Sequence, residues 1–130
     1  MSKRSTETSK WEDQFFRRLS PTAKLLYWYM WDRCDIAGFW EIDFETAAFC
    51  IGEREDRLRE AIKELSNRFL TDKKTLWLKT FLKHQKNANL KTNVKPHIGI
   101  IRKIAAHKSL REAVLEHLGK EELLEVIDDF

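Results

Sequence analysis

One segment constrains the fold of this chain more than any other, because it is apolar on nearly every side. Residues 25–31 read Leu-Leu-Tyr-Trp-Tyr-Met-Trp and follow Ser20 and Pro21. Serine before proline signals a helix start, with Ser20 as N-cap and Pro21 in the first turn, where its missing N–H is no loss. A helix buried on one side only would carry a polar stripe. We therefore predict a helix from Pro21 to about Arg33 that is central or covered by the residues before it.

The segments on either side of this helix have distinct patterns. Before it, Trp11, Phe15, Phe16 and Leu19 recur at helical spacing, and residues 1–10 are expected to form a disordered tail. After it, the pattern predicts a strand at 39–42, a helix capped by Asp43 and stopped by Gly52, a helix at 53–67 and a hairpin at 69–78. Asp72, Lys73 and Lys74 form the hairpin tip.

This order of elements favours a mainly α (α+β) fold. Helix, strand, helix, turn, helix and hairpin is the order of a winged helix-turn-helix with a short β-hairpin wing, here spanning about residues 20–79. We predict a winged-helix domain over residues 11–86 and a polar linker or contact loop over 87–95. A C-terminal helical extension with an acidic tail, over 96–130, would begin at Pro96 and include a helix capped by Ser109 and Glu112.

Charge is distributed unevenly along the chain. Residues 1–72 carry 12 basic and 14 acidic side chains, whereas residues 73–111 carry 11 basic and no acidic ones. Residues 112–130 reverse the sign, with seven acidic side chains and one lysine. The basic stretch suits contact with a polyanion, and pairing between the basic and acidic segments is the alternative.

Several stretches resemble a known family. Residues 16–26 (Phe-Arg-Arg-Leu-Ser-Pro-Thr-Ala-Lys-Leu-Leu), 34–41, Ile51-Gly52, 81–85 (Phe-Leu-Lys-His-Gln) and 96–101 are similar to the N-terminal winged-helix domain of phage replication-initiation or replisome-organiser proteins and the segment after it. The resemblance covers about residues 11–107. It implies DNA binding in phage or prophage replication and contact with replication proteins such as a helicase loader.

The helix at 53–67 occupies the position of a recognition helix, but its outer face is acidic. Helical rotation places Glu53, Asp56 and Glu60 on that face beside Lys63 and Asn67. These acids would repel phosphate, so a solvated surface is an alternative to DNA contact. The side chains that could still reach DNA are Arg54, Arg57, Arg59, Lys63 and Asn67.

The predicted wing and the segment behind it are better suited to phosphate. Lysines at a hairpin tip commonly contact the DNA backbone or the minor groove, although a lysine-rich turn also occurs on ordinary soluble proteins. The residues after the wing interleave lysine with asparagine and glutamine. The predicted contacts here are Lys73, Lys74, Lys79, Lys83, Lys86, Lys91 and Lys95, and Arg102, Lys103, Lys108 and Arg111 extend the charge.

Other kinds of site find little support. Cys34 and Cys50 are too few for a disulfide framework, and their spacing with His84 and His97 matches no zinc motif. Glu41, Asp43, Glu45 and Asp72 could imitate part of a nuclease carboxylate cluster, but capping and solvation explain them better. No phosphate loop or nucleophile motif is present. We expect no metal, cofactor or catalytic residue, no membrane segment and a cytoplasmic setting.

The sequence thus predicts a DNA-binding winged-helix protein with backbone-dominated contacts. A protein-interaction adaptor or an oligomerising transcription regulator, using the aromatic and C-terminal amphipathic helices, is the rival function. The acidic outer face of the helix at 53–67 favours the rival. A homodimer is compatible with both functions.

Overall fold

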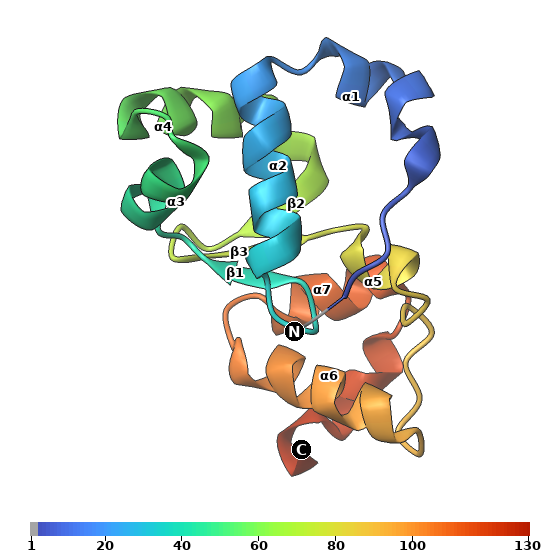
Figure 1. Ribbon diagram of the computed structural model, residues 1–130. Coiled ribbons are helices and arrows are strands. Elements are labelled where there is room, and N and C mark those ends of the chain that lie inside the picture. Colours follow the sequence, from blue (N-terminus) through green and yellow to red (C-terminus); the bar gives the residue numbers. More distant parts are fainter. Residues whose placement is uncertain (1–2) are drawn as a thin grey trace.

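The apolar segment forms the central helix α2 (Pro21–Arg33) of the computed structural model, which describes residues 3–130. The Ser20 hydroxyl oxygen accepts the Ala23 N–H and Pro21 lies in the first turn, as predicted. Leu26 and Met30 are fully buried. In Figure 1 this helix runs through the upper half of the molecule, between α3 and α4 on one side and the N-terminal residues on the other.

The structure is mostly helical with a small antiparallel sheet (Figure 1). In chain order, the helices around α2 are the 3₁₀ helix η1 (Thr8–Glu12), α1 (Gln14–Arg18), α3 (Phe44–Ile51), α4 (Glu55–Glu64), η2 (Ser66–Arg68), α5 (Phe81–His84), α6 (Lys95–Ala106), α7 (Arg111–Leu118), η3 (Glu121–Glu125) and η4 (Ile127–Asp129). The strands are β1 (Phe39–Glu41), β2 (Phe69–Thr71) and β3 (Thr75–Leu78). The predicted strand and hairpin are therefore present.

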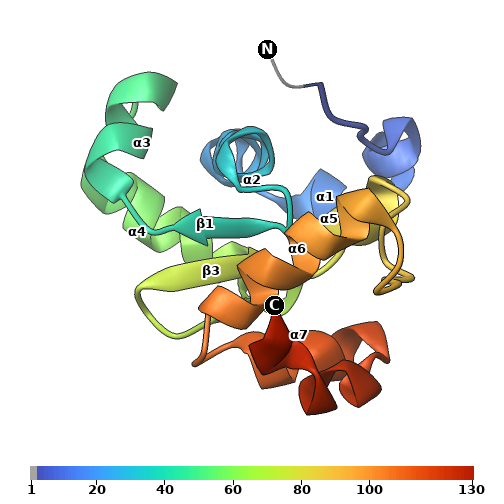
Figure 2. The same ribbon diagram turned by 90° about the horizontal axis from the view of Figure 1, so that it is seen from below.

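The strand order β1-β3-β2 makes β3 the middle of the sheet. All four of its residues are buried, because helices cover both faces. Trp40 of β1 makes an edge contact with Tyr29 of α2, whereas the Trp77 ring of β3 meets His117 of α7. Figures 1 and 2 show the same arrangement, with α2 on one side of the sheet and α7 on the other.

Local capping explains where the middle helices begin and end. Asp43 accepts the Thr46 N–H at the start of α3, and Gly52 ends that helix with φ of 81°, both as predicted. The helix at 53–67 is shorter than expected, since α4 ends at Glu64 and a 3₁₀ turn follows.

The predicted capping box at Ser109 is wrong. The N-cap of α7 is Leu110, which makes no side-chain capping bond. The Ser109 hydroxyl instead donates to the Asp72 carboxylate at the hairpin tip. Ser109 therefore bonds to the charged carboxylate of Asp72, which is distant in the sequence, and not to Glu112, the neighbour that the sequence pattern indicated.

Two segments that were expected to be loosely attached make specific contacts. Arg4 donates to the Trp31 carbonyl at 2.8 Å, and the Trp31 indole N–H donates to the Ser5 carbonyl at 3.0 Å. These bonds attach residues 4 and 5 of the expected tail to α2. In the expected linker, Leu90 is buried in the core.

The C-terminal helices share one hydrophobic core with the rest of the chain. Ile101 and Ile104 of α6 and Leu115 of α7 are fully buried in the same cluster as Leu26 and Trp77. The Phe39 ring also stacks on His107 with centroids 3.9 Å apart. The extension at 96–130 therefore forms one layer of the fold. Among residues 3–130, none of the helices has both the length and the apolar character that a membrane crossing requires.

Candidate functional site

The cations of α4 are already paired with carboxylates of the same helix region. The Arg59 guanidinium lies 2.7 Å from a Glu55 oxygen, and the Lys63 ammonium lies 3.0 Å from Glu60. The other two pairs are Arg54 with Asp56 and Arg57 with Glu53. Exposed pairs of this kind contribute little to stability. They do lower the positive potential that α4 presents to solvent, since each cation has an acid beside it.

The hairpin tip is a rigid turn that presents two lysines. One Asp72 carboxylate oxygen accepts the backbone N–H groups of Lys74, at 2.9 Å, and Thr75, at 2.7 Å. The Thr71 hydroxyl accepts the N–H of Lys73, whose φ is 76°. Both lysine side chains are exposed, and within residues 3–130 neither forms an ion pair.

Ser109 ties this tip to the connection between α6 and α7. Its hydroxyl bonds to the second Asp72 oxygen, so the carboxylate receives three hydrogen bonds. These bonds, the one from Ser109 first, lower the pKa of Asp72 to about 2. The carboxylate is therefore charged at neutral pH and holds the turn. Lys108, next to Ser109, is exposed and adds a third cation near the tip.

The other predicted lysines lie away from the tip. Lys79 is half-buried at the base of the hairpin, where its N–H bonds to the Arg68 carbonyl. Lys83, Lys86, Lys91 and Lys95 are exposed along α5, the following loop and the start of α6. In Figure 1 that loop is at the end of α6 opposite to the one that continues toward Ser109. A helix of this length separates the two ends by about 18 Å. The lysines thus form two groups.

The acidic C-terminal residues leave both lysine groups unpaired. Among residues 3–130, the ion pairs of this segment join Arg111 to Asp128, at 2.9 Å, and Lys120 to Glu122, at 4.0 Å. Arg111 belongs to the basic stretch, so one pair does join the two segments. Within residues 3–130, the other lysines and arginines of the basic stretch form no ion pair.

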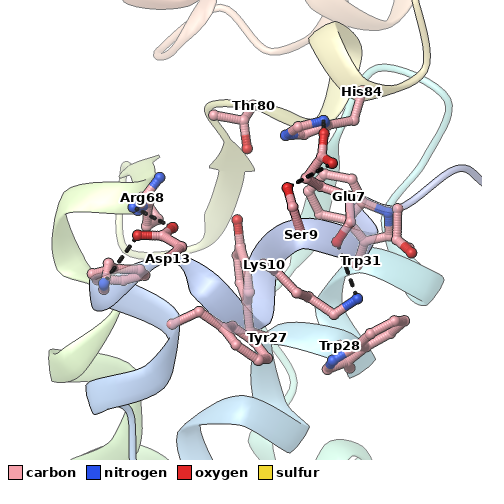
Figure 3. Close-up of a pocket in the computed structure, with 13 residues that line it drawn as sticks. Glu7, Ser9, Lys10, Asp13, Tyr27, Trp28, Trp31, Arg68, Thr80 and His84 are labelled. Atoms are coloured by element: carbon pink, nitrogen blue, oxygen red, sulfur yellow. Dashed lines mark hydrogen bonds and ion pairs between the residues drawn. The ribbon is translucent and has the colours of Figure 1, made fainter.

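A pocket that the sequence did not indicate lies between the N-terminal residues and α2 (Figure 3). Its volume is about 240 Å³. Aromatic rings of α1 and α2 supply most of the walls, and the polar lining comes from η1, η2 and the residues around α5. The lining residues are Thr6, Glu7, Ser9, Lys10, Asp13, Phe15, Phe16, Tyr27, Trp28, Trp31, Arg68, Thr80 and His84.

One wall of the pocket is built around Arg68. Its guanidinium carbon lies 4.0 Å from the centre of the Phe15 ring, and one terminal nitrogen is 3.4 Å from an Asp13 oxygen. The Nε–H of Arg68 is buried and has no hydrogen-bond partner among the described residues. Burial raises the pKa of Tyr27, so its hydroxyl stays protonated and can donate. Figure 3 shows that hydroxyl directed toward Thr80, between Arg68 and His84.

The other wall combines an aromatic ring with charge. The Lys10 ammonium lies 4.2 Å from the centre of the Trp28 ring and also bonds to the Glu7 carbonyl. The Glu7 carboxylate accepts the Ser9 hydroxyl and lies 3.9 Å from His84 Nδ1. No sequence motif points to this pocket, because its parts come from separate elements and become neighbours only in the folded chain.

Neither a metal-binding cluster nor a similarity to known proteins identifies the function of this site. Over residues 3–130, no three His, Cys, Asp or Glu side chains are grouped so that they could hold a metal ion. The chain matches no protein-family model, no curated protein and no solved structure in three comparisons.

Proposed function

We propose that this chain is a DNA-binding winged helix-turn-helix protein that contacts the phosphate backbone through the tip of its β2–β3 hairpin. The observation that carries the proposal is the pair Lys73 and Lys74, exposed on a turn that Asp72 and Ser109 hold in place. A rigid turn lowers the entropic cost of bringing two cations onto phosphates. The element order and the pairing of β1 with β3 support the winged-helix interpretation.

Contact of this kind is dominated by the backbone and reads sequence weakly. The arginines of α4 face their own carboxylates, so this helix assists only when Arg54, Arg57 or Arg59 exchanges its partner for a phosphate. Asn67, exposed in η2, remains available to base edges, and Lys63 joins it only when it leaves Glu60. A role in phage or prophage replication initiation, in contact with replication proteins, follows from the resemblance of the sequence to that family.

The test is a titration of labelled duplex DNA at several salt concentrations, comparing wild type with Lys73→Glu, Lys74→Glu. Backbone contact predicts that log affinity falls with log salt by about 0.9 for each phosphate neutralised. We expect the variant to bind more weakly and to lose about two units of that slope. The matched control is Arg17→Glu, Arg18→Glu, which changes the same charge on the exposed side of α1. An unchanged slope in the wing variant would contradict the proposal.

An exposed aromatic side chain favours a second candidate function, that of a protein-interaction adaptor. Phe49 on α3 is 88% exposed, and Leu25 on the adjacent α2 is 54% exposed. Contiguous apolar patches mark interfaces, whereas single exposed apolar side chains are common on soluble proteins, so this candidate requires Phe49 and Leu25 to be covered together. Phe49→Ser should abolish self-association measured by light scattering if a second copy binds here. A wild-type monomer at high concentration would exclude the homodimer.

A further inference from the structure

We propose that the pocket between the N-terminal residues and α2 binds one unpaired nucleobase of a single strand. This inference rests on the proposed function and adds to it a preference for strands with an unstacked base. The pocket volume of about 240 Å³ suits a group of one or two fused rings.

The aromatic lining provides surfaces on which a base stacks, either on Tyr27 or in place of the cation that covers Phe15 or Trp28. Phe15, Tyr27 and Trp28 line one continuous cavity, with Phe16 and Trp31 also in contact with it. Bases of every type have a π face, so stacking on such rings is strong and tolerant of sequence. Bases can enter such a site only when unpaired, because a duplex keeps them stacked between their neighbours.

The polar lining matches the edge of a base. Two hydroxyls, on Tyr27 and Thr80, can both donate and accept hydrogen bonds. The buried Arg68 Nε–H lacks an acceptor within the described residues, and a base carbonyl would supply one once the Arg68 side chain shifts toward the cavity. Burial of an unpaired N–H costs free energy, so a ligand acceptor recovers that cost on binding.

The charges of the lining favour a neutral ligand at the centre and an anion at the edge. Glu7 and Asp13 balance Lys10 and Arg68, so the sum is zero with His84 neutral. A free anion would meet the two carboxylates. An apolar side chain would leave the Arg68 Nε–H unpaired. A base is neutral, and Lys10 lies over Trp28, where it can reach the attached phosphate.

The pocket and the hairpin tip are separate contacts. In Figure 1 the N-terminal residues and α1 are on the opposite side of α2 from α3 and α4, whereas the tip is on the same side as α3. The Ile42 N–H bonds to the Lys74 carbonyl, which fixes the tip beside the start of α3. Each contact can therefore be removed without the other.

The experiment uses the 130-residue chain with ¹⁵N label and a six-nucleotide oligothymidylate, compared with an abasic strand of equal length and charge. We expect the indole N–H signals of Trp28 and Trp31 to shift with oligothymidylate and the affinity to fall about 5- to 100-fold for the abasic strand. Ser9→Phe, which fills the pocket edge, should bind both strands equally. Its control is Thr8→Phe, an exposed position of the same turn outside the lining.

The outcomes separate this inference from the proposed function. Equal affinity of wild type for the two strands, with the indole signals unmoved, would overturn the pocket proposal and leave backbone binding intact. Failure of duplex and single strand to bind at low salt would overturn both. A third outcome is that a phenylalanine-containing hexapeptide shifts the two indole signals and the oligonucleotide does not. This result would show that the pocket binds a protein ligand, and it would overturn the pocket proposal. Tyr27→Phe keeps the ring and should weaken binding of oligothymidylate alone.

Discussion

The hydroxyl of Ser109 donates a hydrogen bond to the carboxylate of Asp72, 37 residues earlier in the chain. This contact joins the α6–α7 connection to the hairpin tip that carries Lys73 and Lys74. The same carboxylate holds the turn through two backbone N–H groups. The stability of the turn, its response to acid and the presentation of its lysines therefore depend on one side chain.

The response to acid follows from the pKa of Asp72. Its folded value of about 2 lies below the unfolded value of about 3.9, so its contribution to stability is present above pH 4 and is lost as the pH falls through 2. We expect the free energy of unfolding of wild type to fall more steeply between pH 4 and pH 2 than that of Asp72→Asn. Urea denaturation at a series of pH values measures this. Ser109→Ala should lie between the two proteins, and parallel curves for wild type and Asp72→Asn would contradict the assignment.

Glycine at position 38 is required for two reasons. Its φ is 98°, and a Cβ there would lie 3.2 Å from the Phe81 Cβ. Gly52 has φ of 81° with open space around it, so it isolates the backbone effect. We expect Gly52→Ala to lower the free energy of unfolding by about 1 kcal/mol and Gly38→Ala by about 2 to 3 kcal/mol. Thermal denaturation of the two variants measures the difference, and equal losses would mean that Phe81 moves aside.

The two cysteines should differ sharply in reactivity. Cys34 is buried, and burial raises the pKa of its thiol to about 12, whereas Cys50 is exposed. Because the thiolate is the nucleophile, alkylation of the native protein at pH 8 should modify Cys50 first. Mass spectrometry of peptides after timed alkylation locates the label. Cys50→Ser should take up label only under denaturing conditions, and rapid labelling of this variant in the native state would disprove the burial of Cys34.

The carboxylates of α4 should limit DNA binding. Glu55→Gln, Glu60→Gln frees Arg59 and Lys63 from their partners. We expect duplex affinity to rise about 3- to 10-fold at low salt, with a steeper salt dependence, because two more cations become available to phosphate. Glu121→Gln, Glu125→Gln is the control, since it makes the same charge change on the far C-terminal layer at exposed carboxylates that hold no cation within residues 3–130. An equal rise in both variants would indicate a general charge effect and no approach of α4 to DNA.

Local signals predicted the elements well. The helix α2 begins at the expected position after Ser20, with Pro21 in its first turn. The helix α3 begins after Asp43 and ends at Gly52, also as expected, because capping residues act on their neighbours in the sequence. Ser109 was assigned wrongly because its partner is distant. Leu90 shows the same limit, since one buried leucine in a polar stretch carries no periodic signal. The basic candidates are exposed apart from the half-buried Lys79, but the sequence could not show that α4 neutralises its own cations.

The aromatic pocket could not be predicted from the sequence. The aromatic side chains of the pocket have the spacing of core residues, and all of them pack in or against the hydrophobic core. They are Phe15, Phe16, Tyr27, Trp28 and Trp31. The pocket forms because Arg68 and Thr80 lie against these rings, and this depends on how η2 and the residues after β3 pack on α2. Such a relationship is set by tertiary contacts alone.

The order of strands in the sheet has a kinetic consequence. Phe39 of β1 pairs with Trp77 of β3, 38 residues later, whereas β2 and β3 are joined by a three-residue turn. A short hairpin closes within microseconds, but closing a long loop costs entropy before its contacts form. We expect the β2–β3 hairpin and the helices α3 and α4 to form first and to shorten the effective loop. Docking of β1 would then set the folding rate of the whole chain.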